Sequence, residues 1–214
     1  MNNKEEKHLI WDLDGTLLDS YSIILGSLKE ALDEFELNYD KEYILKYIIE
    51  YSVDAFIKKV EKETNFSFSQ IKERYSELND SRSSEIQLIR NAKKLLEELS
   101  KMDVCNYIYT HKGNSTSSIL EKLEIGHYFK EVITSENGFE RKPSPEAIIY
   151  LMNKYEMSNE STFYIGDRSL DIECANNSNI KSVLYLDKYS YGKKSGKEDY
   201  VIGGLLDLLT LIKN

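Results

Sequence analysis

The chain has 214 residues, with 28 Lys and Arg residues against 37 Asp and Glu residues, so its formal net charge is −9. This length predicts one domain, or one domain with a sizeable insertion, and the acidic balance argues against a nucleic-acid-binding protein. The two cysteines, Cys105 and Cys174, are too few for a disulfide framework or a four-cysteine zinc site. We expect both to be reduced core residues.

We expect no targeting segment at the N-terminus. Residues 1–7 are polar and charged, and the apolar run that follows is too short for a signal peptide. No stretch approaches the length of about 20 apolar residues that a membrane span needs. We therefore expect a cytoplasmic protein that does not associate with membranes, with a polar surface loop at residues 189–197.

The predicted elements begin with a short buried strand at residues 9–11, followed over residues 21–80 by apolar residues at helical spacing. From residue 90 onwards, helices and strands alternate. We expect helices at 92–99, 115–123, 145–155, 170–177 and 205–212, and strands at 104–109, 132–134, 162–165 and 182–186. This alternation predicts an α/β fold with a parallel sheet flanked by helices. The core is expected to comprise residues 1–18 and 85–214, and an inserted helical domain residues 19–84.

The first candidate site follows the first strand, where Asp12 and Asp14 precede Gly15. The carboxyl end of a parallel strand opens into the crevice where α/β proteins bind ligands. Two neighbouring carboxylates are costly there without a cation, and Mg²⁺ is typically held by a few carboxylates together with phosphate oxygens. One carboxylate can act as a nucleophile and the other as a general acid or base.

A second acidic cluster follows the strand at 162–165, where Asp167 and Asp171 can complete a metal site. Between the two clusters, Thr110 ends a predicted strand and Lys142 precedes a turn. A hydroxyl and an ammonium at such places can hold phosphate oxygens.

These residues, in this order, resemble the four motifs of the haloacid dehalogenase-like hydrolase superfamily. The motifs are Asp12-Leu13-Asp14-Gly15-Thr16, then Thr110, then Lys142, then Gly166-Asp167 with Asp171. The resemblance covers nearly the whole chain and is closest to the phosphoglycolate-phosphatase-like branch. It implies a Rossmann-like α/β core with a small, mobile, all-helical cap domain inserted after the first motif.

The resemblance also implies a mechanism. Asp12 would attack phosphorus to form an aspartyl-phosphate, and Asp14 would serve as general acid and then as general base. Mg²⁺ would be held by Asp12, the backbone carbonyl of Asp14, Asp167 and Asp171. Thr110 and Lys142 would bind the phosphoryl oxygens.

Several positions are weaker candidates for substrate binding. Many relatives have Asn after the second-motif Thr, whereas this chain has His111 and then Lys112. His111 is expected either to contact substrate or to pack beside the loop. The remaining candidates are Gly15 and Thr16 in the first motif, and Glu50, Tyr51 and Ser52, where relatives place a specificity loop.

The leading hypothesis is a Mg²⁺-dependent phosphatase acting on a small phosphorylated metabolite, with phosphoglycolate or a sugar phosphate as the natural guess. A phosphomutase of the β-phosphoglucomutase type is the alternative enzyme, although Thr16 favours a phosphatase, and a dehalogenase is disfavoured by Asp14. A non-catalytic regulatory or binding protein is the alternative from another class. We expect a monomer or a small homo-oligomer without nucleic-acid partners.

Overall fold

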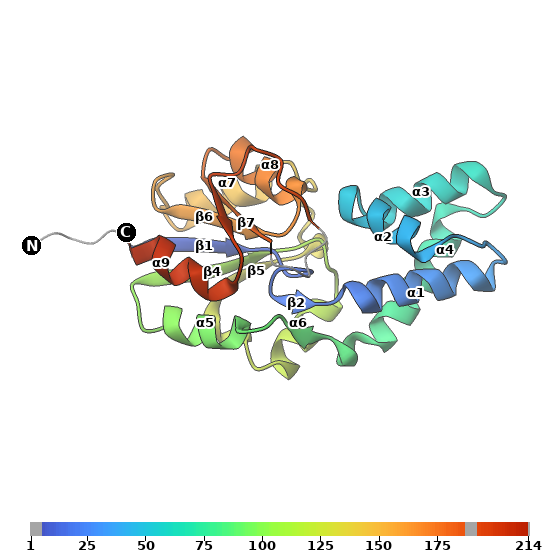
Figure 1. The fold of residues 1–214 in the computed structure, drawn as a ribbon, viewed down its shortest axis with the longest axis horizontal. Helices are drawn as coiled ribbons and strands as arrows, with labels where there is room; N and C mark the ends of the chain where they lie inside the picture. The colour runs from blue at the N-terminus through green and yellow to red at the C-terminus, as the bar shows by residue number, and fades with distance from the viewer. Residues whose placement is uncertain (1–5, 187–191, 214) are drawn as a thin grey trace, which may run out of the picture. The chain divides into compact units, whose positions relative to one another are not determined.

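The computed structural model describes residues 6–186 and 192–213. The expectations for residues 1–5 and for residues 189–191 of the surface loop fall outside this part. The chain divides into two compact units, one made of Met1–Asp19 with Gln87–Asn214 and the other of Ser20–Ile86. Each unit has its own core. Figure 1 shows the sheet and flanking helices of the first unit and the helices of the second.

The first unit contains a parallel sheet with the order β5-β4-β1-β6-β7-β8. Its strands are β1 (Lys7–Trp11), β4 (Val104–Tyr109), β5 (Phe129–Ile133), β6 (Thr162–Gly166), β7 (Lys181–Tyr185) and β8 (Tyr200–Ile202). A separate antiparallel pair joins β2 (Leu18–Asp19) to β3 (Gln87–Leu88). The predicted α/β fold is confirmed.

The position of β1 in the sheet explains its composition. It is flanked on both sides, by β4 and β6, and its last four residues are buried. Strands covered on both faces are continuous apolar runs rather than alternating ones. The neighbouring strand β4 contains one buried amide, Asn106. Its side-chain oxygen accepts a 3.0 Å hydrogen bond from the indole N–H of Trp11.

Helices lie on both faces of the sheet. In Figure 1, α7 and α8 lie on one face and α5 and α9 on the other. The helices of this unit are α5 (Ala92–Leu99), α6 (Ser115–Lys122), α7 (Glu146–Lys154), α8 (Ser169–Asn177) and α9 (Leu208–Lys213), with short 3-10 helices η2 (Gly126–Tyr128), η3 (Ser135–Asn137) and η4 (Leu205–Asp207). Side chains of α7 and α8 pack against Ile10, Tyr107 and Tyr164 of the sheet.

The second unit is helical throughout. It comprises α1 (Tyr21–Glu34), α2 (Lys41–Glu50), α3 (Val53–Glu63), α4 (Phe68–Ser81) and η1 (Ser83–Glu85). Helices α2, α3 and α4 each begin after an N-cap residue. The side chains of these residues, Asp40, Ser52 and Ser67, accept hydrogen bonds from backbone N–H groups in the first turn. Buried apolar residues from all four α-helices form its core.

Some element boundaries differ from the sequence-based prediction. Helix α7 begins at Glu146, so Pro145 caps the helix instead of being its first residue. Strand β8 was missed because two of its three residues are exposed, which removes the apolar pattern. Among the described residues, no helix is long and apolar enough to cross a membrane.

Candidate active site at the carboxyl ends of three strands

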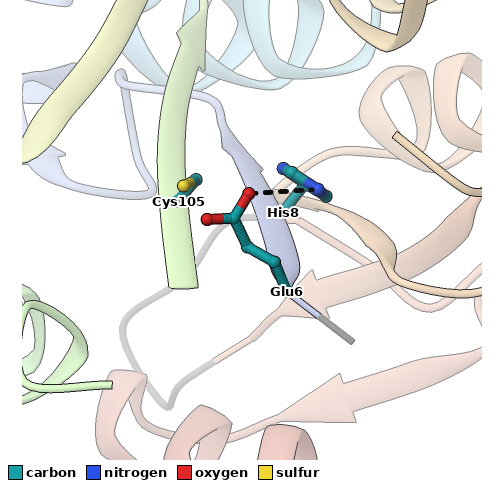
Figure 2. Close-up of side chains that lie close together, drawn as sticks. All are labelled: Glu6, His8 and Cys105. Carbon is teal, nitrogen blue, oxygen red and sulfur yellow. Dashed lines mark ion pairs between the residues drawn. The ribbon is translucent and has the colours of Figure 1, made fainter. Parts of the chain in front are cut away.

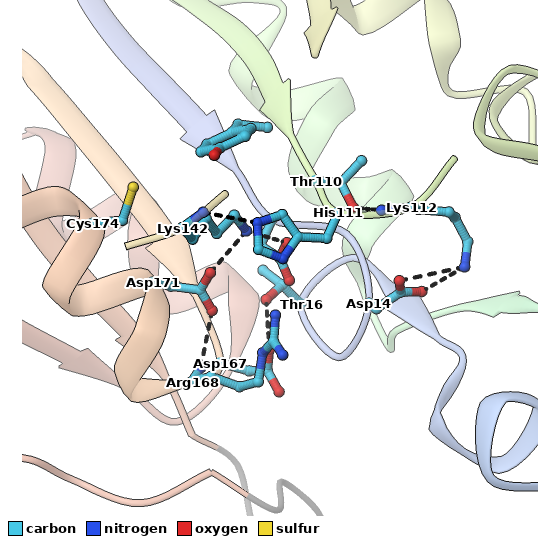
Figure 3. A network of polar contacts seen from close by, with 12 residues as sticks. Asp14, Thr16, Thr110, His111, Lys112, Lys142, Asp167, Arg168, Asp171 and Cys174 are labelled. Atoms are coloured by element: carbon cyan, nitrogen blue, oxygen red, sulfur yellow. Dashed lines mark hydrogen bonds and ion pairs between the residues drawn. The ribbon is translucent and has the colours of Figure 1, made fainter. Parts of the chain in front are cut away.

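Three neighbouring strands each end at a residue of the candidate site. Asp12 follows β1, Thr110 follows β4 and Asp167 follows β6, and all three are buried. Backbone hydrogen bonds of 2.9 Å continue the ladder past the strand ends, from the N–H of Asp12 to Ile165 and from that of Thr110 to Ile133. The sheet therefore holds these three positions at one edge. Figure 3 shows Thr110 and Asp167 within the surrounding network of polar contacts.

Lys142 joins the two acidic motifs. Its Nζ lies 2.6 Å from Oδ1 of Asp12 and 2.9 Å from Oδ1 of Asp171, with the lysine side chain completely buried. The rings of Tyr109 and Tyr164 flank the ammonium, with centroids 5.1 and 5.2 Å away. Such ring faces attract a desolvated cation.

Electrostatics keep this lysine charged. Burial by itself lowers the pKa of Lys142, but the carboxylates of Asp12 and Asp171 outweigh it and raise the pKa above its ordinary value. The two carboxylates share a single ammonium. Burial and the charge of Asp171 therefore raise the pKa of Asp12 to about 6, even though Lys142 acts in the opposite direction.

One oxygen of Asp12 is left without a hydrogen-bond partner. Lys142 holds Oδ1, whereas Oδ2 is buried and has no partner among the described residues. An unpaired buried carboxylate oxygen is costly unless it meets a cation or reacts with a bound group.

The acidic side chains fit a hard divalent cation. Asp12, Asp167 and Asp171 each offer an oxygen, and these oxygens lie within 4.8 Å of one another. Oxygen-only ligands of this kind suit Mg²⁺. The carboxylate of Asp171 already has two partners, because Oδ1 accepts from Lys142 and Oδ2 accepts from the backbone N–H of Arg168 at 3.1 Å.

Glycines make room for this cluster. A Cβ at Gly166 would collide with the Asp171 side chain, and one at Gly192 would collide with the carbonyl oxygen of Asp167. The requirement for glycine at 192 is a feature that sequence reasoning missed, because it lies in a polar loop with no motif around it.

Asp14 is paired with Lys112. Lys112 Nζ lies 2.9 Å from Oδ1 and 3.3 Å from Oδ2 of Asp14, and the lysine side chain is only 5% exposed. The Asp14 side chain is 21% exposed, so the pair lies on the accessible side of the site. The sequence pointed to Lys112 only as a weak candidate for substrate binding, and the structure gives it this ion pair.

The residues after Asp14 form a tight loop. Gly15 has a φ of 83°, in the left-handed region that favours glycine, and its N–H donates to Leu18 at 2.8 Å. The hydroxyl of Thr16 donates to Oδ1 of Asp167 at 3.4 Å and is fully buried. Thr16 therefore connects the first acidic motif to the last.

Thr110 and His111 organise the second motif. Oγ1 of Thr110 accepts a 3.1 Å hydrogen bond from the N–H of Lys112, which leaves its own hydroxyl proton for another acceptor. Nε2 of His111 accepts a 2.9 Å hydrogen bond from the backbone N–H of Lys142. Burial, together with Lys142 and Arg141, lowers the pKa of His111 to about 2, so the ring is neutral. The structure shows His111 packed beside the loop, in contact with Lys142 and Tyr109. Its contact with substrate stays a prediction.

Glu50, Tyr51 and Ser52 belong to the helical unit. They form the junction between α2 and α3, where Ser52 caps α3 through a 3.0 Å hydrogen bond from Ala55 and the Tyr51 side chain is exposed. Their proposed contact with substrate stays a prediction.

The family model for haloacid dehalogenase-like hydrolases matches residues 9–185. The chain belongs to this family. It is 28% identical over 207 residues to pyrophosphatase PpaX of Oceanobacillus iheyensis, covering 95% of each chain. It is also 26% identical over 223 residues to phosphoglycolate phosphatase of Mannheimia succiniciproducens, covering 98% of this chain and 100% of that one.

Solved structures share the fold. A predicted phosphoglycolate phosphatase from Haemophilus somnus superimposes with a TM-score of 0.84, at 22% identity, over 96% of this chain and 97% of that one. A haloacid dehalogenase-like hydrolase from Streptococcus pneumoniae gives a TM-score of 0.80 at 21% identity, over the same shares of the two chains. The family model confirms the resemblance stated from the four motifs, and these structures show the same fold.

Proposed function

We propose that the chain is a Mg²⁺-dependent phosphatase that hydrolyses a small phosphorylated metabolite through an aspartyl-phosphate on Asp12. The observation that carries the proposal is the state of Asp12. One carboxylate oxygen is fixed by Lys142, while the other is buried without a hydrogen-bond partner among the described residues. Membership of the hydrolase family and the names of the two curated relatives support it.

In the first step, Oδ2 of Asp12 attacks phosphorus and the bond between phosphorus and the ester oxygen breaks. Asp14 donates its proton to the leaving alkoxide. Lys142 and the hydroxyl proton of Thr110 offset the charge on the phosphoryl oxygens. Lys142 is suited to this because its position is fixed by two carboxylates and two aromatic rings before substrate arrives.

In the second step, a water molecule attacks the phosphorus of the aspartyl-phosphate. Asp14, now a carboxylate, accepts a proton from this water, and the bond to Asp12 breaks to release inorganic phosphate. The same residue serves as acid and then as base, so the enzyme returns to its starting protonation state.

Asp12, the backbone carbonyl of Asp14, Asp167 and Asp171 would hold the metal ion. When bound, it would offset the negative charge that gathers where a phosphate group meets several carboxylates. The oxygen-only donor set of Asp12, Asp167 and Asp171 fits this ion.

We propose that Ser20–Ile86 is the cap domain and that it selects the substrate, with Glu50, Tyr51 and Ser52 as contact candidates. Phosphoglycolate and sugar phosphates are the proposed substrates. The relatives named phosphoglycolate phosphatase support the first of these.

The test is phosphate release from p-nitrophenyl phosphate, phosphoglycolate, sugar phosphates and pyrophosphate. We expect turnover with Mg²⁺, loss of turnover with EDTA, and recovery when Mg²⁺ is added back. Asp12→Asn should abolish turnover while leaving the circular dichroism spectrum unchanged. Turnover that survives both EDTA and Asp12→Asn would contradict the mechanism, and isomerised sugar phosphate without phosphate release would indicate a mutase.

A further inference from the structure

A second group of metal-ligating side chains lies at the opposite end of β1 from the candidate active site. Glu6, His8 and Cys105 come together where β1 and β4 begin (Figure 2). The parallel register pairs His8 with Cys105, and Glu6 precedes His8 by two residues, which places all three side chains on one face. At a rise of about 3.3 Å per residue, His8 and Asp12 are separated by about 13 Å along the strand.

The spacing of the three side chains approaches that of a metal site. Their ligating atoms all lie within 4.8 Å of one another, and Oε2 of Glu6 lies 3.8 Å from Nε2 of His8. Ligands of tetrahedral zinc, at about 2.0 to 2.3 Å from the ion, lie roughly 3.3 to 3.8 Å from each other. Small side-chain movements would therefore bring all three onto one ion.

The histidine is oriented by a partner on its other nitrogen. Nδ1 of His8 lies 3.3 Å from the hydroxyl of Tyr107, and the ring is 5% exposed. A hydrogen bond to the non-ligating nitrogen fixes the ring of a metal-bound histidine and directs the other nitrogen to the ion. Here that arrangement directs Nε2 towards Glu6.

The donor set distinguishes this cluster from the candidate active site. One nitrogen, one sulfur and one carboxylate oxygen suit a borderline or soft cation, whereas the carboxylates at the other end suit Mg²⁺. Burial raises the pKa of the Cys105 thiol, so the thiol is protonated in the metal-free protein and must release its proton to solvent when it binds.

Lys130 is the cation now facing these groups. Its Nζ lies 3.9 Å from Oε1 of Glu6, and it also interacts with Cys105. The Lys130 side chain is 48% exposed, so it can move into solvent when a divalent ion binds.

We propose that Glu6, His8 and Cys105 form a binding site for Zn²⁺ or a similar thiophilic divalent cation, with the fourth position open to water. The bound ion would join the first residues of β1 to β4 and stabilise the folded state, because it binds only where the strands are paired. This inference does not depend on the proposed phosphatase activity.

The test is a Co²⁺ titration of the reduced protein in excess Mg²⁺, which occupies the oxygen-only cluster. We expect one equivalent to produce a sulfur-to-cobalt charge-transfer band, and one equivalent of Zn²⁺ to remove it. The band should be lost in Cys105→Ser and kept in Cys174→Ser, the matched control for the other buried thiol. Absence of the band in the native chain, or its persistence in Cys105→Ser, would overturn the proposal.

Three further variants keep the test decisive if Cys105→Ser fails to fold. Glu6→Gln changes a part-exposed side chain and should weaken Zn²⁺ binding in competition with Co²⁺ by at least about tenfold, as should removing the orienting hydroxyl in Tyr107→Phe. Lys130→Ala should tighten binding, because a competing cation is removed. Unchanged affinity in both Glu6→Gln and Lys130→Ala would exclude this site.

Discussion

The ammonium of Lys112 lies 2.9 Å from Oδ1 of Asp14, although 98 residues separate the two in the chain. The contact joins the loop after β4 to the loop after β1. It gives the proposed acid and base a fixed partner, while the Asp14 side chain stays 21% exposed. We therefore propose that Lys112 positions the Asp14 carboxylate.

We expect Lys112→Ala to lower kcat for p-nitrophenyl phosphate by about tenfold with little change in KM, because the Asp14 carboxylate loses its fixed orientation. Lys112→Arg should recover part of the rate, since it keeps a cation beside Asp14. Steady-state kinetics with Lys122→Met, which removes an exposed lysine of α6, provides the control. A rise in KM without a loss of kcat would instead assign Lys112 to substrate binding.

The buried charges around Lys142 predict a strong coupling with Asp171. Lys142→Met leaves two buried carboxylates without their cation, so we expect a loss of about 3 kcal/mol or more in the free energy of unfolding at neutral pH. Adding Asp171→Asn should recover part of this loss, because one of the two uncompensated charges is removed. Urea unfolding of the two single variants and the double variant measures the coupling. If Lys142→Met lowered the free energy of unfolding equally in the native chain and in Asp171→Asn, the result would contradict the shared ion pair.

We expect a conservative substitution of Lys142 to lower activity even where the protein stays folded. Lys142→Arg keeps the charge but not the compact ammonium enclosed by Tyr109 and Tyr164. We expect its kcat to fall by about 10²-fold or more. The comparison is made at a temperature where both proteins are fully folded, as shown by circular dichroism.

Gly166 is expected to be intolerant of even one methyl group. A Cβ there would collide with the side chain of Asp171, so Gly166→Ala should displace Asp171 and disturb Lys142 with it. We expect lower thermal stability and a higher Mg²⁺ requirement for activity. Gly126→Ala is the matched control, because the nearest atom to its Cβ would be 3.6 Å away. If Gly166→Ala and Gly126→Ala had the same thermal stability and the same Mg²⁺ requirement, the predicted collision with Asp171 would be contradicted.

His111 predicts a pH dependence of stability. Its pKa of about 2 in the folded chain lies below its ordinary value of 6.5, so the unfolded chain binds the extra proton first as the pH falls. His111 therefore does not reduce the free energy of unfolding above pH 6.5. Below pH 6.5 this free energy falls progressively, by on the order of 1 kcal/mol per pH unit. His111→Gln keeps an acceptor for the N–H of Lys142 but cannot titrate. Between pH 7.5 and 5.5, urea unfolding should show a smaller loss for His111→Gln than for the native chain.

Much of the α/β unit could be predicted from sequence because the signals are local. Strands β1 and β6 carry short apolar runs at residues 9–11 and 163–165, and Asp12 and Asp167 follow directly after these strands. The motif order therefore placed the acidic residues at one edge of the sheet before their contacts were known. Strand β8 carries no such signal, because its exposed residues owe their conformation to pairing with β7.

The partners of individual side chains could not be predicted in the same way. Lys112 and Asp14 meet because two loops lie side by side, and no spacing in the sequence encodes that contact. The neutral state of His111 likewise depends on burial and on the backbone of Lys142, 31 residues away. The cluster around His8 could not be predicted either, because its neighbour Cys105 comes from another strand.

The place of β1 in the middle of the sheet has a consequence for the order in which the chain folds during synthesis. Strand β1, which leads into Asp12, is made first, yet both of its neighbouring strands come much later and begin at Val104 and Thr162. The helical unit Ser20–Ile86, whose core contacts are all internal, can be complete while β1 is still without partners. A nascent chain that ends before residue 162 would therefore hold a complete helical unit, while β1 still lacks β6 and Asp12 still lacks its neighbour Asp167.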